Sequence, residues 1–99
     1  MELYQAEWCP HSHKVRMRLT ELGLDFVARQ VPADPDDREE MLRAVGTNAI
    51  PVLVADEGTV LKGEEEILPY LARLPEREDA PSHRQKARVE VPTFEELKP

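Results

Sequence analysis

A cysteine followed by proline, in the segment Cys9-Pro10-His11-Ser12, is the feature of the sequence best suited to chemistry. Proline is favoured at the first position of a helix, because its missing N–H would be unpaired there. Cys9 is then expected at the helix N-cap, where the partial positive charge and free N–H groups of the helix end stabilise a thiolate over a thiol. The segment therefore predicts a nucleophilic sulfur, whereas a lone cysteine elsewhere is more often small buried filler.

The charges around Cys9 are mixed, since His11 and Lys14 favour a thiolate while Glu7 opposes it. Cys9, His11 and His13 also form a C-x-H-x-H pattern that is worth testing as a metal site. Helix positions two apart point about 200° away from each other, so these side chains do not converge on one ion, and no further ligands are evident. We predict no metal site.

The elements that must position Cys9 are a short strand before it and a helix after it. Residues 1–5 alternate apolar and polar side chains, which is typical of a strand. From Pro10 onward, apolar side chains recur at helical spacing until Gly23, which predicts an amphipathic helix that ends at this glycine. The apolar stripe consists of Val15, Leu19 and Leu22.

The later elements follow from apolar runs, caps and turn signals. Asp34-Pro35 is typical of a helix start, and Asp56-Glu57-Gly58 is typical of a hairpin turn. In chain order we predict a strand at 24–31, a helix at 35–45, strands at 50–54 and 59–62, and a helix at 63–74 that contains Pro69. The predicted order is βαβαββα.

Composition bounds the possible functions. The 99 residues can enclose one modest core, and a net charge of -7 lacks the basic surface that a binder of nucleic acid or anionic membranes needs. With no apolar run long enough to span a membrane and no signal peptide at the start, we expect a cytoplasmic protein. One cysteine cannot form an intramolecular disulfide.

The composition changes near Leu74, because four of the nine prolines follow it. We predict a folded domain at 1–74 and a C-terminal tail at 75–99 that is partly ordered or disordered. Within the tail, Val89-Glu90-Val91 alternates like a short strand, and Thr93-Phe94-Glu95-Glu96 has capping-box spacing.

Taken together, the early strand, C-P-x-S at a helix start, the later I-P-V-L and the closing G-x-x-x-I-x-x-Y-L resemble the glutaredoxin-like thioredoxin fold, as in glutaredoxins and the N-terminal domain of glutathione S-transferases. The resemblance covers residues 1–74. It implies an α/β fold with a four-stranded mixed sheet in the order 2-1-3-4, in which the third and fourth strands are antiparallel and helices cover both faces.

The resemblance also implies a cis bond between Ile50 and Pro51, with the Ile50 backbone free to pair with an extended cysteinyl peptide such as glutathione. In related proteins the segment that opens the third helix binds a carboxylate of glutathione. Here Glu64 stands where the transferases usually carry serine, while Glu65 is placed to receive the ligand's ammonium. The alternative is that both glutamates are solvated residues of a helix start.

Ser12 occupies the place of the second cysteine of dithiol glutaredoxins, which implies monothiol chemistry. Its hydroxyl either donates to the sulfur of Cys9 or satisfies a backbone group. His11 replaces an aromatic residue and either modulates the thiolate with pH or is an exposed loop histidine. Trp8 either lines the substrate groove or is a partly buried aromatic side chain.

Three functional hypotheses follow. In the first, the Cys9 thiolate exchanges with a mixed disulfide of glutathione, of another low-molecular-weight thiol or of a protein, with glutathione as cosubstrate. In the second, the chain is a non-catalytic module that binds glutathione or a peptide. In the third, two chains carry an iron–sulfur cluster with the help of glutathione. The sequence indicates no oligomeric state.

Overall fold

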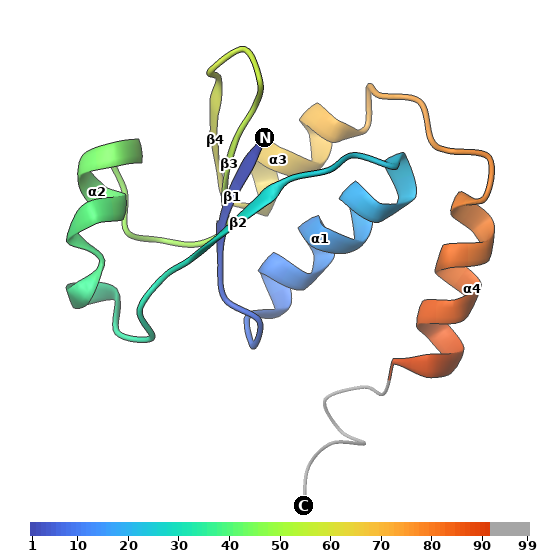
Figure 1. Cartoon of the computed structure of the whole chain (residues 1–99), viewed down its shortest axis with the longest axis horizontal. Helices are drawn as coiled ribbons and strands as arrows, with labels where there is room; N and C mark the ends of the chain where they lie inside the picture. Colours follow the sequence, from blue (N-terminus) through green and yellow to red (C-terminus); the bar gives the residue numbers. More distant parts are fainter. Residues whose placement is uncertain (92–99) are drawn as a thin grey trace, which may run out of the picture.

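The computed structural model describes residues 1–91, which form four strands and four α-helices (Figure 1). The elements are β1 (Glu2–Gln5), α1 (Pro10–Leu22), β2 (Val27–Gln30), α2 (Glu39–Val45), β3 (Val52–Val54), β4 (Val60–Lys62), α3 (Glu64–Leu71) and α4 (Ala80–Glu90). The sheet order is β2-β1-β3-β4, with β1 parallel to β2 and antiparallel to β3, and with β3 antiparallel to β4. The predicted α/β thioredoxin-like fold is confirmed.

Helices cover both faces of the sheet, with α1 and α3 on one side and α2 on the other (Figure 1). Successive side chains of a strand point to opposite faces of the sheet, so each face contributes to its own core. The larger core joins the sheet to α1 and α3 and consists of Leu3, Val15, Leu19, Leu22, Leu53, Ile67 and Leu71. A smaller core beneath α2 consists of Met41, Val45 and Val52.

Helix α1 begins and ends where its sequence signals predict. Cys9 is the N-cap and Pro10 is the first helical residue. Gly23 ends the helix in the left-handed conformation, with φ 69°, and its N–H donates to the carbonyls of Leu19 and Thr20. A residue with a Cβ is strained in this conformation, so the glycine fixes the end of the helix.

The prediction of one continuous helix at 35–45 is wrong. A single 3-10 turn occupies Pro35–Asp37, and α2 begins only at Glu39. The break lies at Arg38, whose φ and ψ of -93° and 45° are not helical. Its buried guanidinium donates to three backbone carbonyls in the flanking loops, those of Pro32, Ala33 and Asn48, and this bonding offsets the interrupted helix.

The short strand predicted at Val89-Glu90-Val91 is also wrong, because α4 continues to Glu90. The alternation of three residues is too short a pattern to distinguish a strand from the end of a helix. The capping-box pattern that begins at Thr93 lies outside the described residues.

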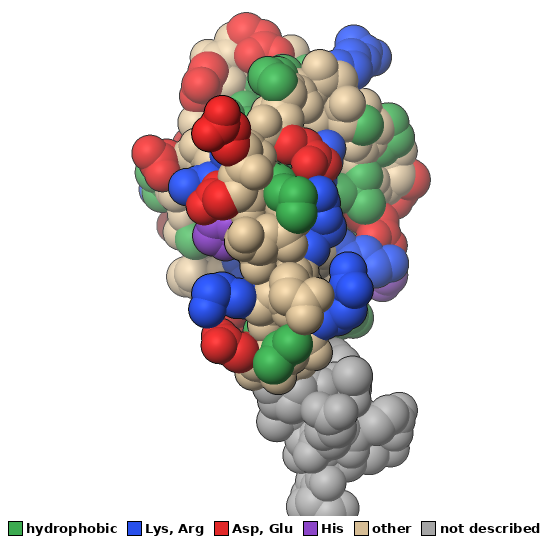
Figure 2. Space-filling view, turned by 90° about the vertical axis from the view of Figure 1, so that its right-hand side faces the viewer, with side chains coloured by type: hydrophobic (Ala, Val, Ile, Leu, Met, Phe, Trp, Pro, Cys, Tyr) green, Lys and Arg blue, Asp and Glu red, His purple; other side chains and the backbone are tan. Residues whose placement is uncertain are grey.

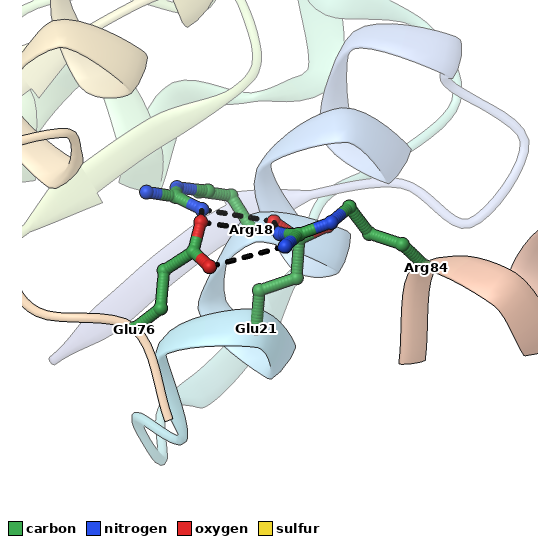
Figure 3. A network of polar contacts seen from close by, with 4 residues as sticks. All are labelled: Arg18, Glu21, Glu76 and Arg84. Atoms are coloured by element: carbon green, nitrogen blue, oxygen red, sulfur yellow. Dashed lines mark hydrogen bonds and ion pairs between the residues drawn. The ribbon is translucent and has the colours of Figure 1, made fainter. Parts of the chain in front are cut away.

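A cluster of four charged side chains holds α4 beside α1 (Figure 3). Arg18 and Arg84 both contact the carboxylates of Glu21 and Glu76, at nitrogen to oxygen distances of 2.7–3.1 Å. The Arg77 N–H also donates to the Glu21 carbonyl at 3.0 Å. The cluster joins α1, the segment after α3 and α4.

We expect the stability that Glu76 contributes to depend on pH. Hydrogen bonds from Arg84 and then Arg18 lower the pKa of Glu76 from 4.5 to about 2. Because the folded-state pKa is below the unfolded-state value, this stabilisation is complete above pH 4.5 and is lost as the pH falls toward 2. Glu76→Gln should therefore unfold at lower urea concentration than the wild type above pH 4.5, and the difference should vanish toward pH 2.

The control is Glu90→Gln, which removes only an exposed partner of Lys86 at 3.8 Å. Urea unfolding followed by far-ultraviolet circular dichroism at a series of pH values measures all three proteins. A destabilisation of Glu76→Gln that is the same at every pH would contradict the prediction.

The face that carries α4 displays basic side chains interspersed with acidic and hydrophobic ones (Figure 2). Among residues 1–91, no helix has the length and apolar character required to cross a membrane.

Candidate functional site

The sulfur of Cys9 lies at the start of α1, where the chain turns from β1 into the helix. The Cys9 N–H donates to the Ala6 carbonyl at 3.1 Å and closes the turn, while the Cys9 carbonyl accepts the N–H of His13 at 3.0 Å. The sulfur itself accepts the N–H of Ser12 at 3.4 Å. Cys9 is 6% exposed, so the sulfur faces the helix N–H groups with little competing water.

The pKa of the Cys9 thiol is lowered below its ordinary value. Burial raises the pKa of the thiol and is the largest single influence. The side chain and N–H of Ser12, the N–H of His11 and the guanidinium of Arg16 lower this pKa, and their sum exceeds the effect of burial. The sulfur is thus better prepared than a free cysteine to react as a thiolate.

Ser12 is fully buried, and its two polar groups behave differently. The N–H donates to Cys9 as an N-cap contact. The hydroxyl oxygen has no regular hydrogen-bond partner among residues 1–91, so it does not satisfy a backbone group there. The Ser12 side chain nevertheless lowers the pKa of the Cys9 thiol, so its hydroxyl is placed to donate to a thiolate.

An open cavity of about 240 Å³ lies beside the start of α1. The residues that line it include five of those singled out from the sequence, namely His11, Ile50, Pro51, Glu64 and Glu65. Ile50 and Pro51 are joined by a cis peptide bond. These five residues come from three separate segments of the chain, whereas Cys9, Pro10 and Ser12 are not among the residues that line the cavity.

Other residues of the site were not expected, or lie elsewhere. Thr47, Ala49 and Lys62 also line the cavity, and only the position of Lys62 directly before Gly63 could have pointed to it. Trp8 is 59% exposed, so it is not the partly buried aromatic residue of one alternative. It is also not among the residues that line the cavity.

Glu64 links the start of α3 to the start of α1. One carboxylate oxygen contacts His11 Nδ1 at 2.5 Å and the other lies 3.5 Å from Lys14 Nζ. The contact with His11, followed by the charge of Lys14, lowers the pKa of Glu64. Glu64 is therefore not a free, fully solvated residue of a helix start, because it bridges two walls of the site.

Glu65 folds back over the N-cap of α3. Its carboxylate lies so close to Gly63 that a Cβ at this position would collide with it, and Gly63 has a φ of 80° that also favours glycine. The Glu65 carboxylate therefore lies at the start of α3, where Gly63, Glu64 and Glu65 line the cavity. In the described part of the chain, no group of three or more His, Cys, Asp or Glu side chains is arranged to hold a metal ion.

Arg16 is a residue of the site that the sequence pattern did not reveal. It lies seven residues after Cys9, which is about two helical turns, and its guanidinium returns along α1 to the loop before Cys9. The spacing from the cysteine was the available signal, but it does not by itself distinguish a site residue from a solvated face of the helix.

Comparison with known proteins gives a consistent result. A family model described as "Glutathione S-transferase, N-terminal domain" matches residues 8–74. Glutaredoxin 3 of Escherichia coli K12 is 29% identical over 56 residues, which are 57% of this chain and 68% of the relative.

Solved structures are similar as well. A glutathione S-transferase from Rhodospirillum rubrum F11 superposes with a TM-score of 0.62 at 30% identity, over 73% of this chain and 32% of that protein. A rice glutathione S-transferase in complex with glutathione gives a TM-score of 0.64 at 25% identity, over 89% of this chain and 43% of that protein. The chain spans less than half the length of these transferases.

Proposed function

Because the chain belongs to the glutathione S-transferase N-terminal domain family, we propose that it is a glutathione-dependent, monothiol thiol–disulfide oxidoreductase that reacts through Cys9. The observation that carries the proposal is the position of the sulfur, which accepts the Ser12 N–H at the start of α1. His11, in the same first turn, lines a cavity that also contains the cis-linked Ile50 and Pro51. The similarity to glutaredoxin 3 supports the reaction class.

In the proposed reaction the Cys9 thiolate attacks one sulfur of a glutathione mixed disulfide. A new disulfide forms between Cys9 and the glutathionyl sulfur as the original sulfur–sulfur bond breaks, and the departing thiolate takes a proton from water. A thiolate from a second glutathione then attacks the glutathionyl sulfur, which releases oxidised glutathione and restores the Cys9 thiolate. Ser12 has no sulfur to resolve the intermediate, so the second thiol must come from solution.

Residues of the cavity are proposed to hold the ligand. The backbone of Ile50 would pair with the cysteinyl part of glutathione. His11, Glu64 and Glu65 would bound the remainder, with the Glu65 carboxylate available to the ligand's ammonium, and the exposed Trp8 would contact the ligand only where it extends beyond the cavity.

A non-catalytic binding module is the second candidate, and one observation favours it. Cys9 is only 6% exposed, and the contact between His11 and Glu64 joins the starts of α1 and α3, so approach to Cys9 is limited. A module of this kind would bind glutathione or a peptide in the cavity without turnover.

Intact-mass spectrometry after exposure to oxidised glutathione tests the proposal. We expect about one glutathione adduct per wild-type chain, because Cys9 is the only cysteine, and none on Cys9→Ser. Ser82→Ala, on the exposed side of α4, is the control and should form the adduct like the wild type. Reduced glutathione should then release the adduct.

The second step separates the two candidates. An adduct that reduced glutathione does not release, together with no turnover of a small mixed disulfide, would favour the binding module. The absence of an adduct on the folded wild-type protein would overturn the proposed reaction.

A further inference from the structure

Arg16 joins the segment before Cys9 to both β1 and α1. Its Nη1 donates to the side-chain oxygen of Gln5 at 2.5 Å and to the Ala6 carbonyl at 3.5 Å, and its Nη2 lies 3.0 Å from Glu7 Oε1. A guanidinium presents several donors in a fixed planar fork, which suits it to hold three groups at once. Three consecutive residues ahead of Trp8 are thereby tied to one side chain.

The Ala6 carbonyl connects Arg16 to the backbone of Cys9. This oxygen accepts both the Arg16 contact and the Cys9 N–H, the latter at 3.1 Å. A shift of the Ala6 carbonyl would therefore move the N-cap residue whose sulfur the proposed reaction uses.

Gln5 extends the same network into the sheet. It is 1% exposed, and its amide nitrogen donates to Gln30 Oε1 on β2 at 3.0 Å while its oxygen accepts from Arg16. A buried amide is costly unless both of its ends are paired, so Gln5 and Arg16 need each other. The Arg16 side chain is 17% exposed, whereas that of Glu7 is 80% exposed. The contacts of Arg16 with Gln5 and Ala6 should therefore hold the segment more strongly than the ion pair with Glu7 does, because water screens an exposed ion pair.

We propose that Arg16 is a positioning residue that clamps the segment from Gln5 to Glu7 and thereby fixes Cys9 at the start of α1. The inference rests on the proposed function only in one respect, namely that a displaced Cys9 would slow the proposed disulfide exchange. Arg16 also brings a positive charge close to the negative charge of Glu7, while His11 and Lys14 on α1 both contact Glu64 at the start of α3.

Two readouts test the clamp without requiring turnover. The pH dependence of iodoacetamide alkylation gives the pKa of the Cys9 thiol, and acrylamide quenching of the fluorescence of Trp8, the single tryptophan, reports how freely the clamped segment moves. In Arg16→Met we expect the thiol pKa to rise, alkylation near neutral pH to slow several-fold, and quenching of Trp8 to increase. Arg16→Lys should restore much of the thiol pKa through its charge but leave quenching increased, because an ammonium lacks the fork.

Arg29→Met is the matched control, since it removes the exposed ion pair with Glu2 on the sheet and should leave both readouts unchanged. Folded Arg16→Met with the thiol pKa and Trp8 quenching of the wild type would overturn the inference. If Arg16→Met does not fold, the test relies on Arg16→Lys alone. Quenching of Trp8 in Arg16→Lys that equals the wild-type value would then overturn the inference. A wild-type protein that shows no disulfide exchange, while the Arg16 variants behave as expected, would refute the proposed function and leave the clamp standing.

Discussion

Ser12→Cys is expected to lose the stable glutathione adduct and to form an internal disulfide with Cys9 instead. The Ser12 N–H already lies 3.4 Å from the Cys9 sulfur, and the two residues share the first turn of α1. Serine and cysteine differ by one atom, and the Ser12 side chain is close enough to the sulfur to lower the pKa of the Cys9 thiol, so the substitution exchanges this hydroxyl for a second thiol at the same place. The introduced thiolate would attack the Cys9 sulfur of the Cys9–glutathione disulfide, which forms the internal disulfide and releases reduced glutathione. This attack within one molecule is far faster than attack by a thiol from solution.

Intact-mass spectrometry after treatment with oxidised glutathione measures the change. The glutathionylated fraction of Ser12→Cys should fall at least about tenfold relative to the wild type, and the protein should be lighter than its reduced form by two hydrogens. Ser82→Cys is the matched control, because it adds a thiol on the exposed side of α4, at the far end of the described chain from Cys9. This control should carry glutathione on both cysteines.

A Ser12→Cys protein that keeps glutathione on Cys9 beside a free second thiol would contradict the prediction. It would mean that the side chain at position 12 points away from the sulfur, although the backbone N–H of this residue contacts it. The idea that this fold performs monothiol chemistry only because Ser12 lacks a sulfur would then fail.

The sequence predicted the start and the end of α1 because the signals there are local. A proline at the first helical position, a capping residue before it and Gly23 at the other end each act within one turn of the helix. The same kind of signal gave a wrong prediction at residues 35–45. Asp34 and Pro35 do start a helical turn, but the buried Arg38 separates this turn from α2. The carbonyls that bond Arg38 come from loops on both sides, and no pattern within the segment could reveal them.

The contacts that shape the site are long-range, and for that reason the sequence left them open. His11 and Glu64 are 53 residues apart, and their contact depends on how α1 and α3 pack on the sheet. The sequence predicts a carboxylate at the start of α3 but does not decide whether solvent or a ligand contacts it. Gln5 was part of an alternating strand, yet it is buried because Arg16 and Gln30 satisfy its amide from two other elements.

The packing of α1 on the sheet should tolerate truncation poorly, and Leu19→Ala is expected to show the largest loss of stability. Leu19 is fully buried in the core that also contains Leu53, Ile67 and Leu71. Removing a buried leucine side chain to its Cβ costs about 2–5 kcal/mol, through lost apolar burial and the cavity that remains. Domains of this size are stable by about 5–15 kcal/mol, so the variant should lose a large share of its free energy of unfolding.

Thermal unfolding followed by circular dichroism measures this loss, with an expected fall in Tm of at least about 8 °C. Leu42→Ala is the matched control, because Leu42 on α2 is 50% exposed and the same truncation should change Tm little. Below its Tm, Leu19→Ala should alkylate at Cys9 with the pH profile of the wild type, since the contacts of the sulfur lie within the first turn of α1. A shifted pH profile in a folded Leu19→Ala protein would mean that the core, and not only the cap, the hydrogen bonds and Arg16, sets the acidity of Cys9.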